Sequence, residues 1–165
     1  MSDHVTHPTP PIGSAAPAIA LPDDTGTIRR LADERGRWVV LFFYPKDDTP
    51  GCTIESCEFR DRLADFQADG ATIWGLSILD SESKARFKAK HALTYPLLAD
   101  EDHAVAEAYG VWREKSMYGK AYMGVARATF LIDPEGRVAH TWDPVKPEGH
   151  AAEVHAALTE LRGRA

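Results

Sequence analysis

Hydrophobic residues fall into short runs separated by polar turns along most of this chain. The longest run, residues 38–44, is apolar, β-branched and aromatic throughout, which predicts a central strand buried on both faces. After a Pro-Gly loop, Phe59, Leu63 and Phe66 recur at helical spacing, and Gly70 supplies a stop signal. The pattern therefore predicts a strand, a loop and a helix over residues 53–68.

The same alternation of short apolar runs and amphipathic stretches continues to the end of the chain. It predicts an α/β sandwich in which a mixed β-sheet is flanked by helices. The polar, Pro-rich residues 1–14 indicate a flexible leader, followed by a single domain over residues 15–165. The further expected elements are a short hairpin (18–21 and 28–31), a strand (72–78), a helix (81–91), an extended piece (95–98), a short helix (102–109), a second hairpin (128–132 and 138–142) and a closing helix (150–161).

The composition favours a soluble protein and argues against a protein that binds nucleic acid or membranes. The chain has 165 residues, of which 44% are hydrophobic and 27% charged, as expected of one soluble domain. Its net charge of −6 argues against binding to nucleic acid or anionic membranes, which requires a basic face. No apolar run is long enough to cross a bilayer, and no secretory signal is evident. We therefore expect a cytoplasmic protein.

The only two cysteines, Cys52 and Cys57, lie five residues apart, directly after the loop. Pro50 suits the first position of a helix and Thr49 the N-cap, which places Cys52 at the third helical position. The unpaired N–H groups and the positive end of the helix dipole favour a thiolate there. Gly51 leaves the approach to the sulfur uncrowded. These features predict thiol redox chemistry.

In a regular helix, residues five apart have Cα atoms roughly 8–9 Å apart, on faces about 140° apart. A disulfide needs Cα atoms within about 4.4–6.8 Å. A Cys52–Cys57 disulfide would therefore require the first turns of the helix to unwind, as in a redox switch rather than a static bridge. The other interpretations are two unreactive structural cysteines, a zinc site, and a thioredoxin-type exchanger, which normally has C-x-x-C spacing.

The segment Pro45-x-x-x-Thr49-x-x-Cys52 resembles the active-site signature of the peroxiredoxins. A second cysteine five residues on, Cys57, is similar to the bacterioferritin-comigratory, or Q-type, subfamily. The resemblance extends over nearly the whole chain and includes residues 98–100, 109–112, 118–120 and 124–133. It implies a thioredoxin-like fold, in agreement with the α/β alternation.

The resemblance also implies a role for each candidate site residue. Cys52 would be the peroxidatic cysteine and Cys57 the resolving cysteine. Thr49 would hydrogen-bond the thiolate and the incoming peroxide, and Pro45 would shield the sulfur from water. Arg127 would hold the thiolate and polarise the peroxide oxygens. A fixed guanidinium is suited to this task, because negative charge develops on the leaving oxygen.

The activity implied by the resemblance is reduction of hydrogen peroxide and organic hydroperoxides without metal, haem, flavin or other cofactor. Thioredoxin or a similar dithiol would recycle a monomer, or at most a weak dimer. Two alternatives are a general protein disulfide oxidoreductase and a non-enzymatic redox-sensing or holdase-like module. We expect Glu55, Arg60 and Asp61, on the cysteine-bearing helix, to form a solvated face.

Overall fold

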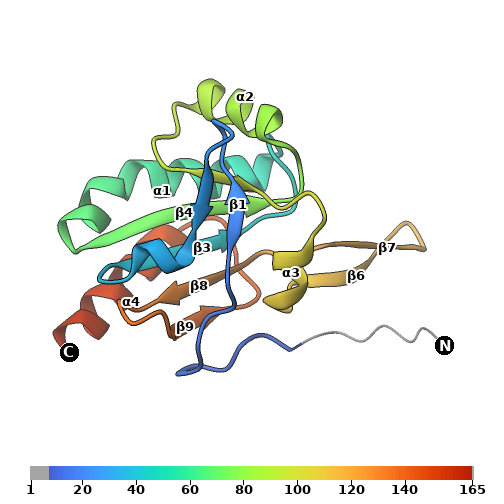
Figure 1. Cartoon of the computed structure of the whole chain (residues 1–165). Coiled ribbons are helices and arrows are strands. Elements are labelled where there is room, and N and C mark those ends of the chain that lie inside the picture. Colours follow the sequence, from blue (N-terminus) through green and yellow to red (C-terminus); the bar gives the residue numbers. More distant parts are fainter. Residues whose placement is uncertain (1–7, 165) are drawn as a thin grey trace.

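The computed structural model describes residues 8–164, which form a five-stranded mixed β-sheet flanked by helices (Figure 1). Its strand order is β5-β4-β3-β8-β9, and two further pairs, β1-β2 and β6-β7, lie outside it. The predicted fold class is confirmed. The strands are β1 (Ala20–Pro22), β2 (Ile28–Arg30), β3 (Trp38–Phe43), β4 (Ala71–Ser77), β5 (Leu97–Ala99), β6 (Trp112–Met117), β7 (Lys120–Val125), β8 (Ala128–Ile132) and β9 (Val138–Trp142).

The predicted central strand is β3, and its two neighbours run in opposite directions. It pairs parallel with β4 and antiparallel with β8. At its end, Phe43 lies opposite Leu76 on one side and Ala128 on the other. The start of β8 therefore lies beside the point where β3 enters the loop to the cysteines.

Helices cover the two faces of the sheet unequally. Alternate residues of β3 point to opposite faces, so Val40 and Phe42 pack in one apolar cluster and Val39 and Leu41 in the other. The first cluster includes residues of α1, α2 and α4, and the second residues of α3 and β1. The helices are α1 (Pro50–Ala68), α2 (Ser81–His91), α3 (Ala104–Ala108) and α4 (His150–Gly163), with a 3₁₀ turn, η1 (Leu31–Glu34).

Most predicted elements are present, with boundaries shifted by a few residues. The helix expected over 53–68 begins at Pro50, where the turn chemistry placed its first position. Of the predicted leader, residues 1–7 lie outside the described residues. Further along that segment, the amide of Gly13 donates to the carbonyl of Val138, and the amide of Val138 donates to that of Ser14. No helix among residues 8–164 is long and apolar enough to cross a membrane.

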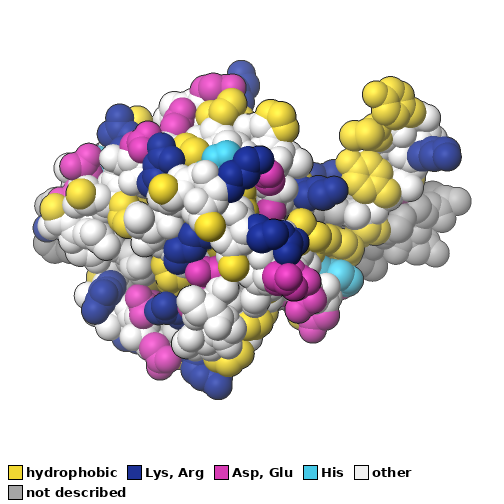
Figure 2. All heavy atoms as spheres, turned by 90° about the horizontal axis from the view of Figure 1, so that it is seen from above, with side chains coloured by type: hydrophobic (Ala, Val, Ile, Leu, Met, Phe, Trp, Pro, Cys, Tyr) yellow, Lys and Arg dark blue, Asp and Glu magenta, His cyan; other side chains and the backbone are white. Residues whose placement is uncertain are grey.

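The hairpin of β6 and β7 is absent from the sequence-based assignment. Its strands are half polar and only partly buried, so no clear alternation marks them. The turn residues Tyr118 and Gly119 both have positive φ, 53° and 76°, as a two-residue hairpin turn requires. The hairpin extends away from the main sheet (Figure 1), and Figure 2 shows apolar side chains gathered on this arm. Its exposed large apolar residues are Met117, Tyr118, Tyr122 and Met123.

Phe59 anchors α1 to the sheet, and its removal tests how much this contact stabilises the fold. The ring is fully buried, stacks on Phe42 with centroids 4.7 Å apart, and contacts Phe66 and His150. We expect Phe59→Ala to lower the free energy of unfolding by about 3–5 kcal/mol, because it leaves a cavity. Urea denaturation monitored by circular dichroism measures the change. The control is Ile54→Ala on the same helix, where the side chain is exposed; an equal loss in both variants would contradict this account.

Candidate active site

The N-terminus of α1 forms one wall of the candidate site. Thr49 is the N-cap, with extended backbone (φ −98°, ψ 155°), and its carbonyl accepts from the amide of Thr53 at 2.8 Å. Pro50 follows as the first helical residue, so Cys52 occupies the third position, as predicted. The Cys52 side chain is fully buried. Its sulfur therefore lies in the first turn, where unpaired backbone amides and the helix dipole favour negative charge.

The Thr49 hydroxyl has a partner that sequence reasoning did not identify. It donates to the carbonyl of Lys46 at 2.9 Å and makes no cap bond to the helix amides. A hydroxyl carries one hydrogen and two lone pairs. In this arrangement the hydrogen is committed to Lys46, and the lone pairs can accept a hydrogen bond from a ligand. Pro45 is half-buried and is the second residue of this loop, after Tyr44.

Arg127 forms the opposite wall. Its Nη2 donates to Sγ of Cys52 at 3.2 Å, although the two residues are 75 positions apart in sequence. The contact follows from topology: Arg127 directly precedes β8, whose first residue, Ala128, pairs with Phe43 at the end of β3. The loop after β3 leads directly into α1, so the first turn of α1 lies next to the end of β3 and the start of β8. The sheet thus brings together the two residues that the resemblance linked.

Gly51 provides the space in which this contact forms. A Cβ atom at this position would lie 3.1 Å from Nη2 of Arg127 and 3.5 Å from Cγ of Pro147. The first distance is tighter than an ordinary van der Waals contact, so any larger side chain would displace the guanidinium. Gly51 was predicted to leave space next to the sulfur. In the structure, the group next to Gly51 that needs this space is the guanidinium of Arg127.

The prediction that Glu55 lies on a solvated face is wrong. Its side chain is fully buried, and Oε1 accepts from Nη1 of Arg127 at 2.7 Å. Burial raises the pKa of Glu55 to about 7, although the positive charge of Arg127 acts in the opposite direction. The available signal was its spacing, because residues three apart on a helix share a face and Glu55 follows Cys52 by three. Arg60 and Asp61 do pair near the surface, at 2.9 Å.

Lys115 of β6 brings a second cation towards the sulfur. It is half-buried, and its ammonium donates to the carbonyl of Val125 on β7. Burial and the charge of Arg127 lower the pKa of Lys115, while Cys52 acts to raise it. Lys115 therefore adds a positive charge from the β6–β7 hairpin to the surroundings of the site. Sequence reasoning missed Lys115 because it missed the hairpin that carries it.

Cys57 lies further along the same unbroken helix. It is partly exposed, packs against the apolar cluster shared by α1 and α4, and is a free thiol like Cys52. α1 is continuous from Pro50 to Ala68, so both cysteines occupy regular helix. The structure is thus the dithiol arrangement in which, by helix geometry, the two sulfurs cannot bond.

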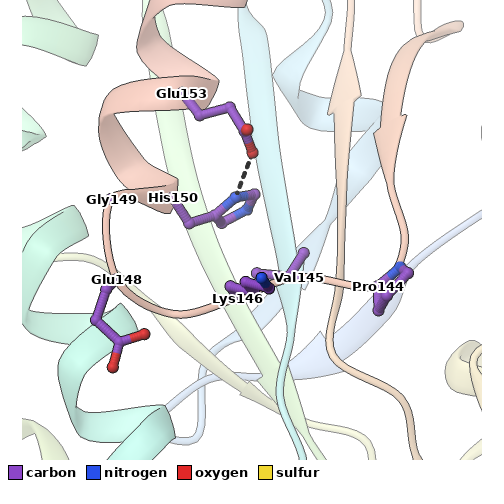
Figure 3. Close-up of a pocket in the computed structure, with 7 residues that line it drawn as sticks. All are labelled: Pro144, Val145, Lys146, Glu148, Gly149, His150 and Glu153. Atoms are coloured by element: carbon purple, nitrogen blue, oxygen red, sulfur yellow. Dashed lines mark hydrogen bonds and ion pairs between the residues drawn. The ribbon is translucent and has the colours of Figure 1, made fainter.

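A cavity of about 330 Å³ adjoins the Arg127 segment at the N-terminus of α4 (Figure 3). The amide of Val145, in its wall, donates to the carbonyl of Arg127 at 3.2 Å. The His150 ring makes two polar contacts. Its Nδ1 lies 3.1 Å from Oε1 of Glu153, and its Nε2 lies 2.8 Å from the hydroxyl of Thr129. Burial lowers the pKa of His150, so the ring is neutral near pH 7 and supports β8 two residues beyond Arg127. The lining residues are Pro144, Val145, Lys146, Glu148, Gly149, His150 and Glu153.

Within residues 8–164, no group of three or more His, Cys, Asp or Glu side chains is arranged to hold a metal ion. The groups that meet at the site are one buried sulfur, a guanidinium and a carboxylate at a helix N-terminus. This combination on a thioredoxin-like sheet defines a thiol-based redox enzyme.

Comparison with known proteins agrees with this class. The model of the AhpC/TSA family matches residues 12–141. Peroxiredoxin Bcp of Bacillus subtilis is 46% identical, over 91% of this chain and 96% of that protein. Peroxiredoxin Bcp of Escherichia coli K12 is 43% identical, over 84% and 88%. A structure of Xanthomonas campestris Peroxiredoxin Q superposes with a TM-score of 0.84, at 43% identity, covering 87% of this chain and 91% of the other.

The chain therefore belongs to the AhpC/TSA family and, within it, to the peroxiredoxins of the Bcp or Q type. The resemblance stated from the active-site signature is confirmed.

Substitution of Gly51 tests whether the position of the Arg127 guanidinium controls the reactivity of the sulfur. We expect Gly51→Ala to slow the reaction of Cys52 with hydrogen peroxide by about tenfold, because the added methyl displaces Nη2. Rapid-quench mass spectrometry of the oxidised product gives the rate constant. Gly163→Ala is the control, since a Cβ there meets no atom within 4 Å. Equal rates in the two variants would show that the guanidinium tolerates the shift.

Glu55 predicts a pH dependence of stability. Its pKa is about 7 in the folded state and near the ordinary 4.5 when unfolded, so the folded protein binds the proton more tightly. The stabilisation from the neutral carboxyl is complete below pH 4.5 and is lost as pH rises through 7. We expect the stability of the wild type, relative to Glu55→Gln, to fall by about 3 kcal/mol from pH 4 to pH 8.

Urea denaturation of both proteins at several pH values measures this difference. The exposed Glu82→Gln variant serves as control, because its carboxylate is solvated in both states. A stability difference between wild type and Glu55→Gln that stays constant with pH would show that Glu55 is already ionised in the folded protein.

Proposed function

We propose that the protein reduces hydrogen peroxide and small organic hydroperoxides through the sulfur of Cys52. The single observation that carries this assignment is the hydrogen bond from Arg127 to Sγ of Cys52 in the first turn of α1. A cation, a helix N-terminus and a buried sulfur together favour a reactive thiolate. The bacterioferritin comigratory protein of Xanthomonas campestris, a structural relative 42% identical to this chain, has alkyl peroxide reduction activity, which supports the substrate class.

The first chemical step is attack of the Cys52 thiolate on one peroxide oxygen. An S–O bond forms, the O–O bond breaks, and the sulfur becomes a sulfenic acid. The other oxygen leaves with the bonding electron pair and takes a proton to become water or an alcohol. Arg127 stabilises this developing negative charge with a fixed N–H donor, and the lone pairs of Thr49 accept from the peroxide hydrogen. Pro45 limits the access of water to the sulfur.

The second step is attack of the Cys57 thiolate on the sulfenic sulfur of Cys52. The S–S bond forms, the S–O bond breaks, and the oxygen leaves as water after protonation. Because both cysteines lie in regular α1, the first turns of this helix must unwind for the sulfurs to meet. The hydrogen bond between Arg127 and Cys52 is broken in the same event. Oxidation is thereby coupled to a local change of fold.

We assign thioredoxin, or a similar dithiol protein, as the reductant that returns the disulfide to two thiols. The exchange is balanced, since the reductant becomes the disulfide as the pair here becomes the dithiol. The protein would act in the cytoplasm, where such reductants keep thiols reduced, as a monomer or a weak dimer.

Peroxide stoichiometry tests this assignment. With one equivalent of hydrogen peroxide, we expect the reduced protein to lose both thiols and two hydrogens, because Cys52 and Cys57 condense to a disulfide. Intact mass and free-thiol count measure the result. The Cys57→Ser variant should consume about one equivalent and stall as a sulfenic acid that dimedone traps.

The matched control is Cys52→Ser, which should leave the thiol of Cys57 unoxidised on the same time scale. Two thiols that remain free in the wild type would overturn the peroxidase mechanism and favour a disulfide exchanger or a redox-sensing module. Undiminished turnover of Cys57→Ser with thioredoxin would show that another thiol resolves the sulfenic acid.

A further inference from the structure

The loop between β3 and α1, residues 44–49, carries two adjacent carboxylates with opposite environments. Asp47 is 7% exposed, whereas the side chain of Asp48 is 43% exposed. Both carboxylates reach residues of α2, which otherwise has no part in the site. The loop that leads to Cys52 is therefore tied to α2 twice, once inside the protein and once at its surface.

The inner connection is a dense network around Asp47. Its Oδ1 accepts from the hydroxyl of Tyr44 at 2.5 Å, and its Oδ2 accepts from the hydroxyl of Ser83 at 2.8 Å. The ammonium of Lys84 lies 3.3 Å from Oδ2 and donates to the hydroxyl of Ser77 on β4 at 2.5 Å. Lys84 is fully buried, with its nitrogen 5.6 Å from the centroid of the Tyr44 ring.

Burial of this charge pair is costly, and the peroxidase chemistry described above does not use it. Desolvation lowers the pKa of Lys84, and Asp47 opposes that effect. Buried ion pairs are often no more stabilising than well-packed apolar residues of the same volume. A fully hydrogen-bonded network does, however, fix one geometry, because any displacement leaves buried charge without a partner. The network thus indicates that the loop of residues 44–49 has to be held in one position.

The loop in turn determines the position of the first turn of α1. The loop residues between the network and the helix are few: Asp48, then the N-cap Thr49, whose carbonyl begins the helix and whose hydroxyl bonds Lys46. The backbone of Arg127 is held separately, by β8 and by the contact of its carbonyl with Val145, although its guanidinium also pairs with Glu55 of α1. A shift of the loop would therefore move the first turn of α1 relative to the backbone of Arg127 and strain the contacts of its guanidinium with Cys52 and Glu55.

We propose that Lys84 acts through Asp47 as a positioning residue of the peroxidase site, holding the loop of residues 44–49 so that Cys52 meets Arg127. This inference rests on the proposed role of Cys52. Lys84 touches neither substrate nor sulfur. It fixes the folded form that reacts with peroxide, while the helix segment beyond the network remains free to unwind for the disulfide step.

The outer connection provides a matched control within the same two elements. Asp48 accepts from Lys90 at 2.7 Å and lies 3.0 Å from Nε2 of His91. The side chains of Lys90 and Asp48 are 61% and 43% exposed, so solvent screens this pair and it contributes little. Lys90 and Lys84 differ mainly in burial, which makes Lys84→Met and Lys90→Met a direct comparison.

The test measures the two chemical steps separately in wild type, Lys84→Met and Lys90→Met, by rapid-quench mass spectrometry of thiol, sulfenic acid and disulfide. We expect Lys84→Met to slow sulfenic acid formation by about tenfold or more, because small misplacements of reacting groups have large effects. Disulfide formation should stay within about threefold, because it follows unwinding of α1 and does not use the positioned site. Lys90→Met should match the wild type in both steps.

A merely structural role for Lys84 predicts different results. If Lys84→Met melts at lower temperature but forms sulfenic acid at the wild-type rate, or if both steps slow equally, the inference is wrong. If Lys84→Met does not fold, Ser83→Ala removes one hydrogen bond to Asp47 and should slow only the first step, by about threefold. An unchanged first step in Ser83→Ala would likewise overturn it. Wild type that does not react with peroxide would instead refute the proposed function.

Discussion

The contact between the Arg127 guanidinium and the Cys52 sulfur is the constraint on which the site depends. It joins the residue before β8 to the first turn of α1, two segments that meet only because β8 pairs with β3. Gly51 keeps the space open and Glu55 holds the other side of the guanidinium. In the proposed mechanism this contact forms while the start of α1 is helical and is lost when that segment unwinds.

Buried polar groups are distributed around the site in two different ways. The Asp47 network is satisfied at each of its charged atoms, as expected of a part that stays fixed. In the helix between the two cysteines, by contrast, Oε2 of Glu55 and Oγ of Ser56 are buried without partners among the described residues. Such groups destabilise the folded state by about 1–3 kcal/mol each. In the proposed mechanism this is the segment that unwinds, and its unpaired groups favour that opening.

The correct predictions rest on patterns among neighbouring residues, whereas the wrong or missing ones concern contacts between residues that are distant in the chain. The strand at residues 38–44 and the helix with Phe59 and Phe66 were predicted correctly, because burial of one or both faces leaves a local pattern. The β6–β7 hairpin was missed, because it is neither buried nor regularly alternating. Glu55 was misplaced, since a lone acid on a helix is usually solvated and only Arg127 makes its burial tolerable.

The sequence by itself determined the order of the strands and helices of the main sheet, the start of α1 at the Thr-Pro-Gly turn and the place of Cys52 in its first turn. Those features arise from local backbone and side-chain preferences. Only the tertiary structure decided that Glu55 is buried against Arg127 and that the buried Asp47–Lys84 pair joins the loop before α1 to α2. Charged residues bury in response to partners that are distant in the chain, and no local pattern reports which partner the fold will supply.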